Sequence, residues 1–189
     1  TINSTELFDF VIDTLQEPLT ERLILEFNQM LKRNTLDQKR GFSGCWKKIP
    51  NTILGVGKQL EVAPPYEVPD SIEALIKSWN GSEKDFDAVV EFHTEFEKIH
   101  PFQDGNGRVG RFLMLKQCLE NEVELLSIDE AYSKEYKSAL FMAQTEGDDT
   151  ELKNVFVQCQ QLMDEKLGFL ENTLAYLRKA ENDEDIKMN

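Results

Sequence analysis

A glycine-bearing break at residues 100–111 separates two runs of apolar residues, and it constrains the fold more than any other part of this sequence. The break reads His100-Pro-Phe-Gln-Asp-Gly-Asn-Gly-Arg-Val-Gly-Arg111. The run before it contains Phe86, Val89, Val90 and Phe96, and the run after it contains Val109, Phe112, Leu113 and Leu119. Both runs have the spacing of a helix with one apolar face, whereas Asp104 to Gly107 is not typical of regular structure. The sequence therefore predicts a helix, a loop and a second helix.

The loop has the residues needed to bind a polyphosphate. Gly105 and Gly107 let the backbone come close to a ligand, so that successive N–H groups can form a concavity for an anion. The N-terminus of the following helix adds partial positive charge at the same place. Arg108 and Arg111 are three residues apart and share a helix face, where both guanidinium groups can contact phosphate oxygens.

A carboxylate and a titratable base accompany the phosphate-binding residues. Asp104 can supply one oxygen ligand to a magnesium ion that is otherwise held by waters and substrate oxygens. His100 has an ordinary pKa near 6.5, so at neutral pH it is largely uncharged and can take a proton from an attacking hydroxyl. These residues together predict a site that holds and cleaves a nucleotide.

The pattern His-x-Phe-x-Asp-Gly-Asn-Gly-Arg-x-x-Arg resembles the signature of Fic-domain proteins. It is complete at His100, Phe102, Asp104, Gly105, Asn106, Gly107, Arg108 and Arg111. The resemblance implies an all-α, mainly helical Fic fold with a small β-hairpin flap, and transfer of AMP from ATP to a protein hydroxyl. It assigns His100 as general base and Asp104 as Mg²⁺ ligand, and it gives Gly105, Asn106, Gly107, Arg108 and Arg111 to the phosphates. Phe102 is expected to be a buried anchor for the loop.

Similarity to the family extends over roughly residues 18–165. Residues 44–55 and 62–66 resemble the flap over the active site, and their β-branched residues predict two short strands around Gly55-Val-Gly57. In the family an extended segment of the target protein pairs with this flap, which implies target docking at Asn51, Thr52, Ile53 and Leu54. Tyr136 and Gln144 resemble residues that close the adenine side of the nucleotide site.

Apolar spacing outside the motif predicts a single, mainly helical domain over residues 1–189. Helices are expected over residues 6–15, from Leu19-Thr20-Glu21 onward, after the cap 69–71, over 86–99, after the motif, and over 131–143. A C-terminal helix over about 150–180 and a frayed acidic tail at 181–189 complete the chain, with the core at about 18–165.

Charge, hydropathy and cysteine spacing limit which partners and which cellular compartment we expect. The formal net charge of −14 repels nucleic acid, and no basic stripe offsets it, so we expect no nucleic-acid partner. No segment has the length and apolarity of a membrane span, and the three cysteines lack paired spacing, so a cytoplasmic protein is expected. The sequence contains no zinc-binding motif, so we expect no zinc site. The other histidine, His93, lies on an apolar helical run, and its spacing predicts a packing residue.

We therefore predict a protein adenylyltransferase that transfers AMP from Mg-ATP to a Ser, Thr or Tyr hydroxyl of a target protein, or of itself. One alternative is a Doc-like phosphotransferase that acts as a protein kinase, although that branch usually has lysine at the position of Gly107. The other alternative is a non-catalytic nucleotide-binding interaction module.

Regulation is expected to come from a segment that this sequence does not contain. Many Fic enzymes are inhibited by a helix with Ser or Thr followed four residues later by Glu, and no Ser or Thr here has that partner. The sequence predicts that the inhibitory helix lies upstream of Thr1 or on a separate, antitoxin-like protein. The oligomeric state and the identity of the target do not follow from the residues.

Overall fold

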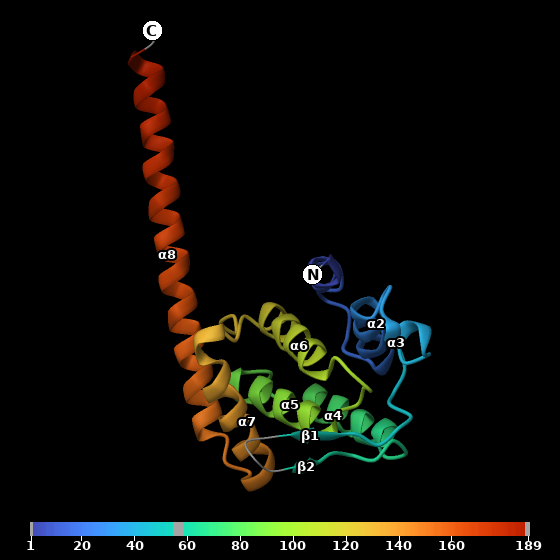
Figure 1. Cartoon of the computed structure of the whole chain (residues 1–189). Coiled ribbons are helices and arrows are strands. Elements are labelled where there is room, and N and C mark those ends of the chain that lie inside the picture. The colour runs from blue at the N-terminus through green and yellow to red at the C-terminus, as the bar shows by residue number, and fades with distance from the viewer. Residues whose placement is uncertain (1, 55–58, 188–189) are drawn as a thin grey trace.

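The chain folds into a helical domain with one small hairpin and one long projecting helix. The computed structural model describes residues 2–54 and 59–187 (Figure 1). The elements in chain order are α1 (Ile2–Asp13), α2 (Glu21–Leu31), α3 (Leu36–Lys39), β1 (Thr52–Leu54), β2 (Gln59–Glu61), α4 (Val68–Gly81), α5 (Phe86–Ile99), α6 (Asn106–Glu120), the 3₁₀ turn η1 (Glu130–Tyr132), α7 (Ser133–Glu146) and α8 (Thr150–Lys187). This arrangement confirms the predicted mainly α-helical fold with a small β-hairpin.

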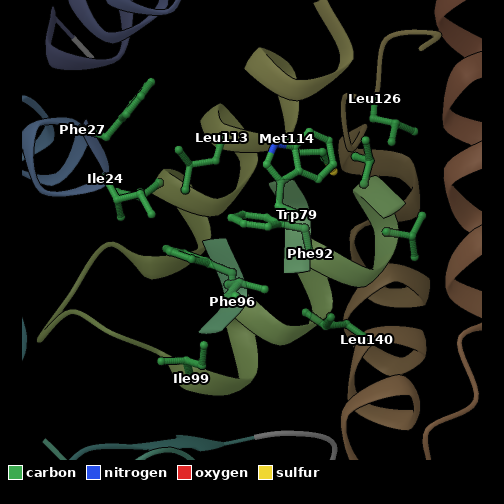
Figure 2. Close-up of a cluster of buried hydrophobic side chains, with 14 of the residues drawn as sticks. Ile24, Phe27, Trp79, Phe92, Phe96, Ile99, Leu113, Met114, Leu126 and Leu140 are labelled. Atoms are coloured by element: carbon green, nitrogen blue, oxygen red, sulfur yellow. The ribbon is translucent and has the colours of Figure 1, made fainter. Parts of the chain in front are cut away.

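Helix α5 is the centre of the domain. It packs against α4, α6 and α7, while α1 and α2 cover α6 from the other side. Figure 2 shows the side chains that meet there, with Phe92, Phe96 and Ile99 of α5 among residues from the surrounding helices. The other labelled members of this buried cluster are Ile24, Phe27, Trp79, Leu113, Met114, Leu126 and Leu140. Because α5 is held on several sides, the residue that ends it has a fixed position.

Two helices begin where the sequence predicts. Helix α5 spans Phe86–Ile99, and the carboxylate of Asp85 caps it by accepting from the N–H of Ala88. Helix α2 begins after Thr20, whose hydroxyl accepts from the N–H of Leu23 at 3.2 Å. Both starts follow from a capping side chain that precedes an apolar stripe.

Other boundaries differ from the prediction. Helix α1 begins at Ile2 rather than at residue 6, α4 begins at Val68 rather than after the expected cap, and α7 begins at Ser133 after the turn η1. Helix α8 continues to Lys187, so the backbone of the predicted frayed tail is helical through that residue. No proline interrupts residues 150–187, and their abundant Leu, Glu and Lys have high helix propensity, which accounts for the extension. The one-turn helix α3 was not predicted.

The hairpin confirms the two predicted strands. Strands β1 and β2 are antiparallel, with Thr52 opposite Glu61, Ile53 opposite Leu60 and Leu54 opposite Gln59. The predicted turn at Gly55-Val-Gly57 lies outside the described residues. The hairpin is the whole sheet within the described chain, so its strands have edges to which another strand could add.

Candidate active site

The candidate base stands at the C-terminal end of the central helix. His100 is the residue after α5, and its backbone is left-handed, with φ 51° and ψ 58°. Its N–H donates to the carbonyl oxygen of Phe96 at 3.0 Å, which completes the helix end. A left-handed conformation costs a non-glycine residue about 1–2 kcal/mol, and such strain is typical of functional positions. The helix end therefore holds His100 in a conformation that a flexible loop would not favour.

His100 is uncharged at neutral pH. Its side chain is 20% exposed, and burial lowers its pKa to about 4. The nearby charge of Lys47 contributes to this lowered pKa, while the backbone of Glu97 and the charge of Asp104 oppose it. An uncharged imidazole can accept a proton, so the protonation state suits the predicted base.

The loop after His100 turns directly into helix α6. Gly105 has φ 92°, and a Cβ added there would lie 2.9 Å from Cδ2 of Leu31. Helix α6 begins at Asn106, so the prediction that residues 104–107 are all irregular is wrong for Asn106 and Gly107. The reason is that one left-handed glycine is enough to reverse the chain and start the next helix. The free N–H groups of the first helical turn consequently point toward the loop where a phosphate is expected.

The side chain of Asn106 braces this loop. Its Oδ1 accepts from the N–H of Phe102 at 2.7 Å, and its Nδ2 donates to the carbonyl oxygen of Phe102 at 2.8 Å. Phe102 is fully buried between Trp46 and Phe96, which confirms the predicted anchor. The side-chain amide of Asn106 therefore uses both its oxygen and its nitrogen to hold the backbone of Phe102.

Asp104 is an exposed, ionised carboxylate beside two cations. Lys32, the residue that follows α2, donates to Oδ2 of Asp104, and Arg108 lies 3.4 Å from the same oxygen. Partial burial would raise the pKa of Asp104, but the hydrogen bond and charge of Lys32, the charge of Arg108 and the N–H of Gly105 lower it below its ordinary value. No local pattern predicts this contact of Lys32, which reaches the loop from the distant end of α2.

These residues fit a magnesium ion that arrives with a nucleotide. Asp104 has 60% of its side chain exposed, so one face is open to solvent and ligand. The described residues contain no cluster of three or more groups able to hold a metal ion by themselves. Magnesium commonly keeps several waters and combines one or two carboxylates with substrate phosphates, and a single exposed Asp matches that donor set.

The second arginine of the motif lies against a buried glutamate. Arg111 folds back along α6, and its Nη1 is 3.2 Å from the place where a Cβ on Gly107 would stand. Oε1 of Glu97 is 3.8 Å from that same place. Glu97 was not predicted as a site residue, although it precedes His100 by one helical turn. Burial raises the pKa of Glu97 to about 7, and the charge of Arg111 only partly opposes this.

The root of the hairpin is tied to the loop that contains the base. Lys47 Nζ donates to Oδ1 of Asn51 at 2.9 Å and to the carbonyl oxygen of Ile99 at 3.2 Å. Nδ2 of Asn51 donates to the carbonyl oxygen of Phe102 at 3.0 Å. The structure therefore uses Asn51, one of the residues predicted to dock a target, as a brace between the hairpin and the loop.

The remaining hairpin residues predicted to dock a target lie on strand β1. Thr52 is exposed and Ile53 is half-buried. Leu54 ends the described part of the strand.

The two residues predicted for the adenine side are both buried in α7. Tyr136 is 5% exposed, and its hydroxyl lies 2.8 Å from Nε2 of His93. Gln144 is 8% exposed, and its Nε2 donates to none of the residues that the structure describes. His93 is a buried packing residue, as its spacing predicts, and burial lowers its pKa to about 4.

An apolar pocket adjoins the two motif arginines. It has a volume of about 520 Å³ and includes Phe8 of α1, Arg108 and Arg111 of α6, and Met163 of α8. The pocket lies between the start of α6 and the segment 125–128.

Among the described residues, no helix combines the length and the apolarity that crossing a bilayer would require.

Comparison with known proteins agrees with this geometry. A probable protein adenylyltransferase of Aquifex aeolicus is 37% identical over 131 residues, which are 68% of this chain and 38% of that protein. A Fic-domain signalling protein of Bacteroides thetaiotaomicron has a TM-score of 0.63 at 21% identity, over 87% of this chain and 64% of that one. Fic-1 of C. elegans has a TM-score of 0.69 at 18% identity, over 90% of this chain and 52% of that one.

The chain thus spans little more than a third of the curated relative and about half to two thirds of these solved structures. The structural likenesses, at this level of identity, concern the fold. The family model described as Fic/DOC matches residues 18–118, which is more than half of the sequence and includes the whole motif from His100 to Arg111. This chain belongs to the Fic/DOC family.

Proposed function

We propose that this chain is the catalytic domain of a protein adenylyltransferase, which transfers AMP from ATP to a Ser, Thr or Tyr hydroxyl of a protein. The observation that carries the proposal is the meeting of an uncharged His100 with the N-terminus of α6 and its two arginines. A hydroxyl that enters beside His100 would lie next to the place where the first turn of α6 binds a phosphate. The relative from Aquifex, named a probable protein adenylyltransferase, supports this reaction.

The reaction needs one proton transfer and one displacement. The hydroxyl oxygen attacks the α-phosphorus of ATP, and its proton passes to Nε2 of His100. A bond forms between that oxygen and the α-phosphorus, while the bond from the α-phosphorus to the oxygen it shares with the β-phosphate breaks. Pyrophosphate leaves with the electron pair. The N–H groups at the start of α6, together with Arg108 and Arg111, stabilise the negative charge on the phosphates.

Magnesium would be held by Asp104 and the phosphate oxygens. When bound, it neutralises phosphate charge during the displacement. Lys32 and Arg108 surround the same carboxylate and keep it ionised over the whole neutral range. Arg108 and Arg111 of α6 would neutralise the rest of the negative charge on the phosphates.

The hairpin is proposed to present the target. Strand β1 has an exposed Thr52 and belongs to a two-stranded sheet, so an extended target segment can pair with an edge of this sheet. The braces from Lys47 and Asn51 keep that edge close to the loop of His100. Backbone pairing of this kind accepts many sequences, and the domain itself could supply the hydroxyl.

Restraint of the enzyme is proposed to come from a helix that lies upstream of Thr1 or on a separate protein. The pocket beside Arg108 and Arg111 supports this, because its apolar walls and two cations match an apolar helix that bears an acidic residue. If an upstream segment or added partner leaves low activity unchanged, the proposed restraint is wrong.

The cytoplasm is the proposed compartment, since it supplies ATP and keeps free cysteines such as Cys45, Cys118 and Cys159 reduced.

Labelled ATP tests the reaction. The protein and its His100→Ala variant are incubated in a cell lysate with ATP labelled at the α- or the γ-phosphate. Adenylyl transfer predicts protein-bound label from α-labelled ATP alone, and only with the intact histidine. Label from the γ-phosphate would instead establish a phosphotransferase, and ATP binding without any transfer would favour an inhibited enzyme or a binding module.

A further inference from the structure

Glu97 is a buried carboxylate whose neighbours do not satisfy its hydrogen-bonding capacity. Its side chain is 7% exposed, and no described residue forms a hydrogen bond with Oε1. Oε2 lies 4.0 Å from Nδ1 of His100, and within the described part of the chain this Nδ1 also lacks a hydrogen bond of good geometry. A buried carboxylate is costly for folding unless it is paired, so its presence beside the base requires an explanation.

The packing around Glu97 fixes its carboxylate in place. A Cβ added to Gly110 would lie 2.5 Å from Oε1, so α6 approaches Glu97 as closely as a glycine allows. Arg111 of α6 and Tyr136 of α7 face the carboxylate from two other elements. His93 lies one turn earlier on α5, with its Cε1 3.4 Å from the same added Cβ. Glu97 therefore cannot turn toward solvent without displacing its neighbours.

We infer that Glu97 is a positioning residue for proton transfer by His100. Its carboxylate keeps a proton on Nδ1, leaves Nε2 free to face the target hydroxyl, and stabilises the imidazolium that forms when that proton is taken. A carboxylate that orients the far nitrogen of a catalytic histidine is a known way to increase its effectiveness as a base. The inference rests on the proposed function, because it assumes that His100 is the base.

The protonation states give this arrangement a characteristic pH dependence. With a pKa of about 4, His100 alone would be a weaker base than the one near neutral pH that proton transfer favours. An ionised Glu97 compensates, because negative charge beside Nδ1 stabilises the protonated ring. Burial raises the pKa of Glu97 to about 7, so its ionised form becomes dominant only above neutrality. The transfer rate should therefore rise with pH through about 7.

Steady-state kinetics test the inference with three variants. The rate at which label from α-labelled ATP enters the principal labelled protein of a lysate is followed as ATP and pH vary. Glu97→Gln is expected to lower kcat about 10- to 100-fold, part of the 10²- to 10⁴-fold that a general base contributes, with less than about a threefold change in the KM for ATP. It should also abolish the rise near pH 7, and Glu97→Asp should retain the rise. Glu95→Gln, an exposed carboxylate on the same helix, is the matched control and should behave as wild type.

NMR of ¹⁵N-histidine-labelled protein provides a readout that does not depend on activity. In the wild type the ring of His100 should carry its proton on Nδ1 and should sense a titration near pH 7, and Glu97→Gln should remove that titration. The backbone carbonyl of Glu97 also lies near the ring and is retained in Glu97→Gln, so an unchanged tautomer and titration would assign the orienting role to the carbonyl and overturn the inference.

The outcomes separate the inference from the proposed function. Wild-type kcat and pH profile in Glu97→Gln, with no activity in His100→Ala, would overturn the role of Glu97 and leave adenylyl transfer intact. No His100-dependent label in the wild type would refute the proposed function, and the NMR titration would still decide whether Glu97 controls the ring.

Discussion

Two glycines of helix α6 should respond oppositely to the same substitution. Replacing glycine by alanine within a helix favours folding by up to about 1 kcal/mol. At Gly110 the new methyl would stand 2.5 Å from Oε1 of Glu97 and 3.2 Å from Cδ1 of Phe96, and overpacking of this kind costs about 1–3 kcal/mol. At Gly107 the nearest atom is the flexible end of Arg111 at 3.2 Å, which can move. We therefore expect Gly110→Ala to be destabilised by up to about 2 kcal/mol and Gly107→Ala to be neutral or stabilised.

Urea unfolding followed by circular dichroism measures both variants, and thermal melting should show Gly110→Ala several degrees below wild type, since 1 kcal/mol corresponds to about 2–4 °C at this chain length. A double-mutant cycle identifies the cause. In a Glu97→Ala background the clash partner is gone, so Gly110→Ala should cost less than it does in the wild type. Equal costs in both backgrounds, or a Gly110→Ala variant as stable as Gly107→Ala, would refute the reasoning about this contact.

Three further predictions concern the buried groups around the base. Phe102→Ala should cost about 3–5 kcal/mol in urea unfolding, because it empties a fully buried aromatic site under the loop, and a loss below 1 kcal/mol would contradict its role as anchor. Glu97→Gln should be more stable than wild type at pH 8 by up to about 3 kcal/mol and equal to it at pH 4.5. The reason is that the folded pKa of about 7 lies above the unfolded 4.5, so the wild type regains stability as pH falls through this window; a constant difference across the window would contradict it. Lys47→Met should destabilise the fold by about 1–3 kcal/mol through two unpaired acceptors, and it should raise the pKa of His100 in an NMR titration by removing a nearby cation.

Local signals in the sequence were sufficient for the frame of the site. The apolar stripe of α5 and the glycine-bearing break place the end of α5 beside the start of α6 without any knowledge of distant contacts. The residues of the motif then meet because they are neighbours in the chain. Phe102 was predicted correctly for the same reason, since a lone phenylalanine in a polar loop has few positions other than the core.

The rest of the site depends on contacts between distant segments. A glutamate on a helix is usually solvated, and Glu97 is buried only because α6 and α7 cover that face of α5. Lys32 and Lys47 reach the loop from segments more than 50 residues away, and nothing in their own neighbourhood indicates this. Asn106 was predicted to contact the phosphates, and the two hydrogen bonds between its side-chain amide and the backbone of Phe102 were not foreseen.

The hydrogen bonds between the hairpin and the loop fix the distance from strand β1 to His100. Lys47 also donates its backbone N–H to the carbonyl oxygen of Pro101 at 2.8 Å, so the strand that would pair with a target and the histidine that would take its proton belong to one rigid frame. A target backbone bound along β1 would then lie at a set distance from His100. Only a side chain whose hydroxyl spans that distance would react, so short Ser or Thr and long Tyr side chains would be separated by reach. Selectivity among targets would thus come from length rather than from the sequence around the modified residue.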